Sequence, residues 1–379
     1  MQIVHDEAHL ERAMHELSVA GTLGREGGLS SERPVLIDRF LDDATEIDVD
    51  AIRDSTGEVL IGAVMEHVEE AGVHSGDSAC VIPPPTLEAW VVEAVESYTK
   101  VIANALDVRG LINVQFAVAG SQIYVIEANP RASRTVPFVA KATGVPLAKI
   151  ASRVMLGASL AQLRSEGLLK KPVSGKHVSV KEAVLPFSRF PEVDTALGPE
   201  MRSTGEVMGI DSTFGRAFVK AEIAAGTELP TSGMVFLSLN DRDKPSGLVV
   251  AKRLRELGLG IVATSGTADY LQRFGHPVDR VVGKVSETTA AQSTRGKKEK
   301  NSQPDDAVEL IKRGEIAFVI NTPQGRGGRS DGEAIRKAAN IFRVSSVTTI
   351  NAALAAVQGL FEQQEHPLEV KSLQEYHQQ

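Results

Sequence analysis

Five polar residues in the first half of the chain have types and spacing suited to binding a metal-bound polyphosphate. They are Gln115, Glu127, Asn129, Arg131 and Arg134. Glu127 and Asn129 are two residues apart, so a strand would project both side chains to one face, and Gln115 could face them from a partner strand. Carboxylate and amide oxygens suit a hard cation such as Mg²⁺, which is usually shared with phosphates. Because arginine supplies forked donors for phosphate or carboxylate-like groups, the set predicts ATP chemistry.

Taken singly, each of these residues is more often an ordinary strand end or a solvated loop residue, so the prediction depends on their convergence on one hairpin. Residues 111–118 and 122–127 are rich in β-branched side chains and are joined around Gly120, which predicts that hairpin.

Hydrophobic periodicity predicts the elements that must position the hairpin. We expect an amphipathic helix over residues 6–17 and a glycine-rich loop over residues 21–33. Strands of an antiparallel meander with one polar face are expected over residues 35–40, 46–53 and 59–66. Further helices are expected over residues 86–106, capped by Thr86, and over residues 146–156.

After about Gly226 the pattern changes to short alternation of strands and helices, which is typical of a doubly wound parallel sheet. The predicted strands cover residues 234–239, 261–264 and 316–321. The predicted helices cover residues 246–257, 267–274, 305–312 and 332–340. Residues 293–306 have no apolar pattern and are expected to be a flexible loop. The sequence therefore predicts two domains, residues 1–225 and residues 226–379.

A second candidate site lies at the strand ends of the second domain. Residues 263–267 leave a strand and open a helix, where backbone N–H groups and hydroxyls can form an anion pocket. Residues 321–325 end the next core strand on the same rim, where ligands of open α/β sheets bind. With Lys244 and Lys284 as counter-charges, the rim is predicted to bind a phosphate ligand. The alternative is that such turns only cap helices.

Composition excludes several classes of protein. At 379 residues the chain is long enough for two cores. The balance of 41 Lys+Arg against 49 Asp+Glu disfavours a general nucleic-acid-binding or membrane-binding surface. The single cysteine, Cys80, excludes an intrachain disulfide framework and is expected to be a small buried residue. The amino terminus does not read as a signal or transit sequence, and no run has the apolar length of a membrane span, so we expect a cytoplasmic protein.

Several longer segments of the chain resemble those of a known protein family. Over essentially its whole length the chain resembles the carboxy-terminal part of the large subunit of carbamoyl phosphate synthetase. The matching segments are long and ungapped, and they include the polar turn that follows residue 72. They cover residues 40–43, 72–80, 113–134, 141–149, 180–182 and 197–209.

The resemblance implies an ATP-grasp segment followed by a small methylglyoxal-synthase-like domain, in an α/β and α+β fold class. The implied activity is phosphorylation of carbamate by ATP with Mg²⁺ or Mn²⁺, as part of a glutamine-hydrolysing ligase for arginine and pyrimidine biosynthesis. The implied partners are a glutaminase small subunit and the remainder of the large subunit, with UMP or IMP as effectors. A homo-oligomer is also allowed.

The resemblance also implies a role for individual residues. The metal ions would be held by Gln115, Glu127 and Asn129, and the carbamate or the transferring phosphoryl group by Arg131 and Arg134. Glu46 would bind the ribose. Residues that would line the nucleotide are Arg39, Leu41, Gly72, Val73, His74 and Ser75. Residues that would bind the effector are Ser238, Lys244, Thr264, Thr267, Lys284, Asn321 and Thr322. Ornithine would bind at Glu69, Asp77, Glu182 and Thr348, where Ser346 replaces an expected tyrosine.

The chain starts just after the glycine-rich phosphate loop of the family would end, so the resemblance implies an ATP-grasp fold that lacks its amino-terminal portion. This departure leaves an alternative open, a catalytically inactive chain that acts only as a nucleotide-monophosphate-binding regulatory module. A third interpretation, methylglyoxal synthase activity of the second domain alone, rests on fold similarity, which does not carry chemistry.

Overall fold

A computed structural model of the chain describes most residues of two compact units, residues 1–43 and residues 44–379. The described residues are 4, 6–23, 34–41, 43–169, 177–190, 193–283, 306–322 and 329–378. Among them, no helix combines the length and the apolar character that a membrane span requires.

The first unit confirms the predicted amino-terminal helix, which extends as α1 over Glu7–Leu23. The predicted strand over residues 35–40 is wrong, because residues 34–40 have no regular secondary structure. Leu36 is 82% exposed and Ile37 is 60% exposed, so this run does not bury the apolar face that stabilises a strand. Of the predicted loop, residues 21–23 complete α1, and residues 24–33 lie outside the described residues.

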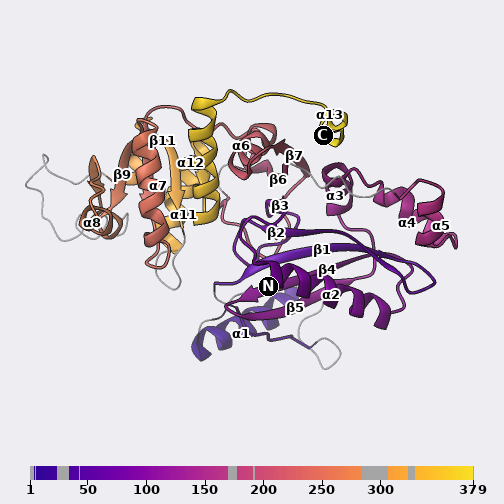
Figure 1. Ribbon diagram of the computed structural model, residues 1–379. Helices are drawn as coiled ribbons and strands as arrows, with labels where there is room; N and C mark the ends of the chain where they lie inside the picture. Colours follow the sequence, from indigo (N-terminus) through magenta and orange to yellow (C-terminus); the bar gives the residue numbers. More distant parts are fainter. Residues whose placement is uncertain are drawn as a thin grey trace, which may run out of the picture. The chain divides into compact units, whose positions relative to one another are not determined.

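The second unit begins with a seven-stranded sheet whose neighbouring strands are all antiparallel, in the order β5-β4-β1-β2-β3-β6-β7 (Figure 1). The strands are β1 Thr45–Arg53, β2 Val59–His67, β3 Cys80–Ile82, β4 Gly110–Ala119, β5 Gln122–Asn129, β6 Val178–Val184 and β7 Gly205–Asp211. The helices and the 3-10 turn in this part are α2 Ala89–Ala105, α3 Thr135–Thr143, α4 Leu147–Met155, α5 Leu160–Ser165, η1 Pro186–Arg189 and α6 Phe214–Ala225.

The alternation of acidic and aliphatic residues along β1 decides how this sheet packs. Ile47 and Val49 point to the face covered by α2, in a core with Val95. At one end of the opposite face, Ile52 packs in a core with residues of α3, α4 and α5. The polar end of that face carries Glu46 and its alternate neighbours along β1, which are buried rather than solvated.

The predicted cap of α2 is wrong. The helix begins at Ala89 with Glu88 as its N-cap residue. The backbone N–H and the hydroxyl of Thr86 donate instead to the carboxylate of Glu66 on β2. Thr86 therefore fixes the approach to the helix from the sheet, since a buried carboxylate is the stronger acceptor.

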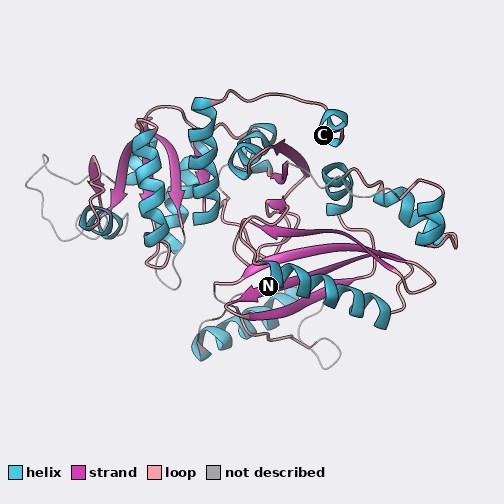
Figure 2. Ribbon diagram, viewed as in Figure 1, coloured by secondary structure: helices cyan, strands magenta, loops and turns pink. Residues whose placement is uncertain are grey.

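A five-stranded parallel sheet follows, in the order β10-β9-β8-β11-β12 (Figure 2). Its strands are β8 Met234–Ser238, β9 Gly260–Thr264, β10 Arg280–Val282, β11 Ile316–Asn321 and β12 Ser345–Val347. The helices are α7 Lys244–Glu256, α8 Ser265–Arg273, α10 Ala307–Lys312, α11 Arg329–Ile341, α12 Ile350–Glu365 and α13 Leu373–His377. Leu237 packs with α7 and α12, and Phe236 packs with α10 and α11, so helices cover both faces. This confirms the predicted doubly wound arrangement. Most of the predicted loop over residues 293–306 lies outside the described residues.

The two sheets share one hydrophobic core through the crossing of α6 and α12. Phe218 on α6 belongs to the same buried cluster as Leu237 on β8 and Ala353 on α12. A Cβ atom added at Gly215 would lie 2.7 Å from the backbone nitrogen of Gly359, so any side chain there would force the helices apart. The predicted division between residues 225 and 226 falls between the two sheets and stays a prediction.

The last element returns to the first sheet, and we call residues 366–377 the C-terminal strap. Arg216 on α6 donates to two carbonyl oxygens of the strap, at 2.5 and 3.1 Å. The hydroxyl of Tyr376 donates to a carbonyl oxygen of β7 at 3.0 Å, and His377 Nε2 donates to a carbonyl oxygen of α3 at 2.8 Å. The strap therefore ties the end of α12 to α6, to the edge strand β7 and to α3.

Candidate functional site

The hairpin of β4 and β5 brings the predicted metal ligands onto one face. Gln115 lies directly opposite Glu127, and Asn113 lies directly opposite Asn129. Residues directly opposite each other in an antiparallel pair project to the same face, which confirms the predicted orientation of Gln115 toward Glu127. The side-chain amide of Asn129 donates to Glu127 Oε1 at 2.7 Å. The face therefore presents amide and carboxylate oxygens side by side.

The polar row continues onto β1 and reveals a residue that the sequence prediction missed. Asp50 lies opposite Asn113 and is 1% exposed. Its carboxylate accepts from the side-chain amide of Asn113 at 3.0 Å, from the hydroxyl of Ser133 at 2.8 Å and from the hydroxyl of Thr135 at 2.6 Å. Because Ser133 and Thr135 flank Arg134, Asp50 fixes the backbone that carries this arginine.

Burial raises the pKa of Asp50 to about 6, although its three donors pull the pKa down. The sequence signal that could have found Asp50 is the acid at every second residue of β1. Of that series only Glu46 was assigned a role.

Both predicted arginines are exposed at the exit of the hairpin. Arg131 Nη1 donates to the carbonyl oxygen of Ala132 at 3.1 Å. Arg134 immediately precedes α3, and its Nη1 lies 3.5 Å from the hydroxyl oxygen of Ser203. These positions present guanidinium groups next to the oxygen-rich face of the sheet.

Glu46 and the turn that begins at Gly72 are brought together. The backbone N–H of Gly72 donates to Glu46 Oε2 at 3.1 Å, and Glu46 is 6% exposed. Burial raises the pKa of Glu46, and the nearby His67 partly offsets this effect. The negative charge of Glu127 raises the pKa of Glu46 further, so the predicted ribose ligand and a predicted metal ligand share one electrostatic environment.

The remaining predicted nucleotide contacts fall into two groups. Val73 and His74 use their backbone N–H groups within the structure, the former toward Glu70 and the latter toward the carbonyl of Gly198 at 2.8 Å. The carbonyl oxygen of Ser75 accepts from the ammonium of Lys181 at 3.1 Å. The other two predicted contacts belong to the separate compact unit of residues 1–43. These are the exposed Arg39 and the half-buried Leu41.

A buried ion network crosses the middle of the sheet beside this site. His67 Nε2 donates to Asp48 Oδ2 at 3.2 Å, and Cys80 lies opposite both His67 and Lys181. The side-chain ligand atoms of Asp48, His67 and Cys80 lie within 4.8 Å of one another. Burial would lower the pKa of Lys181, but Cys80 and the surrounding carboxylates raise it. Because the ammonium of Lys181 supplies a cation here, we assign the cluster to a structural ion network.

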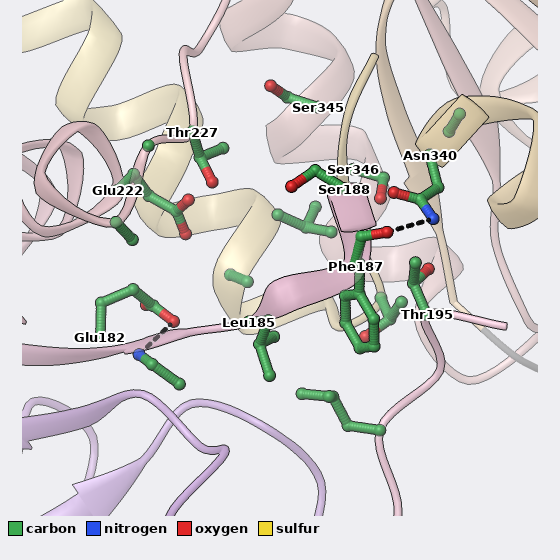
Figure 3. Close-up of a pocket in the computed structure, with 18 of the residues that line it drawn as sticks. Glu182, Leu185, Phe187, Ser188, Thr195, Glu222, Thr227, Asn340, Ser345 and Ser346 are labelled. Carbon is green, nitrogen blue, oxygen red and sulfur yellow. Dashed lines mark hydrogen bonds between the residues drawn. The ribbon is translucent and has the colours of Figure 1, made fainter. Parts of the chain in front are cut away.

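A cavity of about 550 Å³ lies between β6 and the segment around β12 (Figure 3). We call it the junction cavity. Figure 3 shows Glu182 and Glu222 on one side of the cavity and Ser346 and Asn340 on the other. All four residues that were predicted to contact ornithine line this cavity. These are Glu69, Asp77, Glu182 and Thr348.

Three glutamates give this cavity its electrostatic character. Burial raises the pKa of Glu69 to about 7 and that of Glu222 to about 7. Burial also raises the pKa of Glu182 well above its ordinary value, and the charges of the other two carboxylates act in the same direction. The cavity can therefore hold protons near neutral pH or accept a cationic group. Sequence reasoning missed Glu222, because its position on a helix carries no motif.

Three of the predicted effector residues lie at the carboxyl ends of three adjacent parallel strands, which we call the rim. Ser238, Thr264 and Asn321 end β8, β9 and β11. The chain order reverses between β8 and β11, and such switch points are where ligands of doubly wound sheets bind. Ser238, Thr264 and Asn321 are thus brought together on one edge of the parallel sheet.

Hydrogen bonds fix the rim in advance of any ligand. The hydroxyl of Thr267 accepts from the backbone N–H of Leu239 at 3.0 Å and from the hydroxyl of Thr264 at 3.2 Å. The backbone N–H of Thr322 donates to the carbonyl oxygen of Ser238 at 3.0 Å. Two predicted counter-charges remain. Lys244 forms an ion pair with Asp241 at 2.5 Å, and Lys284 lies outside the described residues.

Two family models match the chain. The carbamoyl-phosphate synthase L chain, ATP binding domain, matches residues 1–163, and the MGS-like domain matches residues 247–348. These matches agree with the antiparallel sheet of the first part and the parallel sheet of the second part, and they confirm the predicted fold class.

Similar proteins cover the whole chain. A carbamoyl phosphate synthase large chain of Methanosarcina barkeri is 48% identical over 378 residues, which are 100% of this chain and 87% of that protein. The large chain of Synechocystis sp. is 49% identical over 376 residues, 99% of this chain and 32% of that protein. The large chain of Archaeoglobus fulgidus is 47% identical over 380 residues, 100% of this chain and 32% of that protein. The chain thus spans about a third of the length of the last two relatives.

Proposed function

Because the chain belongs to the carbamoyl phosphate synthase large-chain family, we propose that it is the carbamate-phosphorylating segment of a glutamine-hydrolysing carbamoyl phosphate synthase. In this proposal, residues 1–225 form the ATP-grasp segment and residues 226–379 the regulatory domain. The observation that carries the proposal is the register of β4 and β5, which sets Gln115 opposite Glu127 within the stretch that matches an ATP binding domain. The product would serve arginine and pyrimidine biosynthesis, and a reducing compartment such as the cytoplasm suits the buried free thiol of Cys80.

The donor set fits Mg²⁺ or Mn²⁺. Gln115, Glu127 and Asn129 offer one carboxylate and two amide oxygens as ligands, and the amide nitrogen of Asn129 donates to Glu127 Oε1. A bound divalent ion would neutralise charge on the phosphates of ATP. Arg131 and Arg134 would hold the carbamate and the transferring phosphoryl group, a role that matches their forked donors.

The chain's own residues would contribute mainly positioning and charge, which is sufficient for phosphoryl transfer. Asp50 would hold the backbone on both sides of Arg134 through the hydroxyls of Ser133 and Thr135. Glu46 would accept a hydrogen bond from a ribose hydroxyl. The turn of residues 72–75 would line the nucleotide.

The second part of the chain supplies the proposed regulation. UMP or IMP would bind at the rim, where backbone donors and hydroxyls suit a phosphate. The residues proposed for this role are Ser238, Lys244, Thr264, Thr267, Lys284, Asn321 and Thr322. An amino acid with a cationic side chain, such as ornithine, would suit the acidic junction cavity. The proposed protein partners are a glutaminase small subunit and the remainder of the large subunit.

The test of this function is formation of ATP from MgADP and carbamoyl phosphate by the purified chain. We expect activity that depends on Mg²⁺ and is lost in Glu127→Ala, because this change removes the carboxylate of the proposed metal site. Glu93→Ala, on the exposed side of α2, is the matched control and should retain activity. Equal activity in the wild type and Glu127→Ala would refute the assigned site.

A second candidate function is a regulatory module that binds nucleoside monophosphates without turnover. The hydrogen-bonded rim supports it, because Thr264 and Thr267 are already fixed at the strand ends. Calorimetric titration with UMP and with MgADP separates the two functions. Binding of UMP alone, without binding of MgADP or ATP formation, would favour the regulatory module.

A further inference from the structure

A buried arginine joins the rim to a loop of the first part of the chain. Arg336 on α11 is 2% exposed. Its Nε and Nη2 atoms lie 2.8 Å from the two carboxylate oxygens of Asp194. Its third nitrogen, Nη1, donates to Asn321 Oδ1 at 3.1 Å. One planar guanidinium group thus fixes both a proposed effector contact and a residue outside the regulatory domain.

Asp194 begins a loop, residues 194–203, that is clamped onto the turn beside the nucleotide residues. The side chain of Arg202 donates to the carbonyl oxygen of Asp194 at 2.8 Å. The backbone N–H groups of Arg202 and Ser203 donate to the two carboxylate oxygens of Asp77, at 2.7 and 2.8 Å. The hydroxyl of Ser203 donates to the carbonyl oxygen of Gly76 at 2.9 Å. The loop is therefore bound firmly to the turn that contains Asp77.

The far end of the loop reaches the proposed phosphoryl-transfer site. The hydroxyl oxygen of Ser203 is the atom that lies 3.5 Å from Arg134 Nη1. The carbonyl oxygen of Gly198, within the same loop, accepts from the backbone N–H of His74. A continuous series of contacts therefore runs from Asn321 through Arg336 and the loop to Arg134.

We propose that Arg336 and Asp194 are positioning residues that couple occupancy of the rim to nucleotide binding at the hairpin site. This inference rests on the proposed function of both sites. A phosphate ligand that engages Asn321 competes with Arg336 for the same side chain. Since the guanidinium and the carboxylate pair in one planar geometry, a displaced Arg336 shifts Asp194 and the loop attached to it. By linkage, nucleotide binding at the hairpin changes effector affinity by the same factor.

Calorimetry on the full 379-residue chain measures the coupling itself. The Kd of MgADP is determined by calorimetry with and without saturating UMP. In the wild type we expect UMP to change this Kd by about fivefold or more. In Asp194→Asn and Arg336→Met we expect the change to fall below about twofold, while the Kd of MgADP alone stays within about twofold of the wild-type value. Wild-type coupling in both variants would overturn the proposal.

Two further variants separate coupling from general damage. Arg336→Lys keeps the charge but not the planar fork, so it should also lose coupling. Arg153→Met removes a surface pair with Glu166 that has two short bonds, at 2.9 and 3.1 Å, and should keep coupling. Arg336 is 2% exposed, so a variant at this position can misfold. Asp194 is 29% exposed, so the conservative Asp194→Asn breaks the same ion pair with less damage to the fold.

A readout without ligands distinguishes failure of the inference from failure of the proposed function. Absence of any UMP or MgADP binding would refute the proposed function. In that case hydrogen exchange decides the structural claim. Asp194→Asn should speed exchange of the backbone amides of Arg202 and Ser203 as well as amides in α11. Faster exchange confined to α11 would overturn the proposed route.

Discussion

Replacement of Glu222 by glutamine should change how the stability of the chain depends on pH. Glu222 lies on α6 and lines the junction cavity with Glu69 and Glu182. It is 8% exposed. Burial holds its pKa at about 7, compared with an ordinary value of 4.5. Glutamine keeps the shape of the side chain but cannot ionise, so the variant isolates the cost of charging this position.

The sign and size of the effect follow from linkage. A carboxylate whose pKa is raised by folding contributes stability that is complete below pH 4.5 and lost as pH rises through 7. One pKa unit corresponds to about 1.4 kcal/mol, so wild type should lose about 2.5 kcal/mol through this group between pH 5 and pH 8. Glu222→Gln should remove that loss. Its neighbour Glu182 also becomes easier to ionise, which acts in the same direction.

The assay is urea unfolding at pH 5, 6, 7 and 8, followed by the fluorescence of Trp90, the single tryptophan, and by far-ultraviolet circular dichroism. The free energy of unfolding of Glu222→Gln should exceed that of wild type by about 2.5 kcal/mol more at pH 8 than at pH 5. Glu93→Gln, at an exposed position of α2, is the control and should follow wild type. A pH-independent difference between Glu222→Gln and wild type would refute the reasoning.

Three further predictions concern the buried polar contacts. Asp50→Ala leaves three donors without an acceptor and should lower the free energy of unfolding, measured with urea, by about 3 kcal/mol. A decrease no larger than that caused by Asp50→Asn would contradict this prediction. Lys181→Met removes a buried positive charge beside Asp48, which then keeps its contact with His67, and should cost about 3 kcal/mol by the same assay. Wild-type stability would show that the ammonium is not needed. Tyr376→Phe removes one hydrogen bond worth about 1 kcal/mol between the strap and β7. Tryptic cleavage after Lys371 in the strap should therefore become about fivefold faster. An unchanged cleavage rate would contradict the anchoring role of Tyr376.

The parts that the sequence predicted well are those in which neighbours along the chain decide the structure. The hairpin of β4 and β5 has a two-residue period and a short turn, so both the strands and the facing of Gln115 and Glu127 followed from local pattern. The strands β8, β9 and β11 are continuous apolar runs, as expected of a sheet covered on both faces.

The parts that it missed depend on partners far away in the sequence. The strands β3, β10 and β12 have three residues each, too few to show a period, and exist because neighbouring strands pair with them. Residues 35–40 have the composition of a strand, but composition does not supply a partner.

The site shows the same limit. Asp50 acquires its role from Asn113, Ser133 and Thr135, which approach it only in the folded sheet. The pairing of Arg336 with Asp194 spans 142 positions of the chain. No local motif marks Asp50 or Arg336. Arg131 and Arg134 are easier to find because they directly follow a predicted strand.

The C-terminal strap has a consequence for the order in which the molecule is made. Its residues are translated after every other element described, yet they bond to carbonyl groups of α3 and β7, which leave the ribosome much earlier. Domains generally fold as units during synthesis, starting from the amino-terminal side. The seven-stranded sheet must therefore fold with these positions open to water, and the strap closes over them only after it has itself left the ribosome.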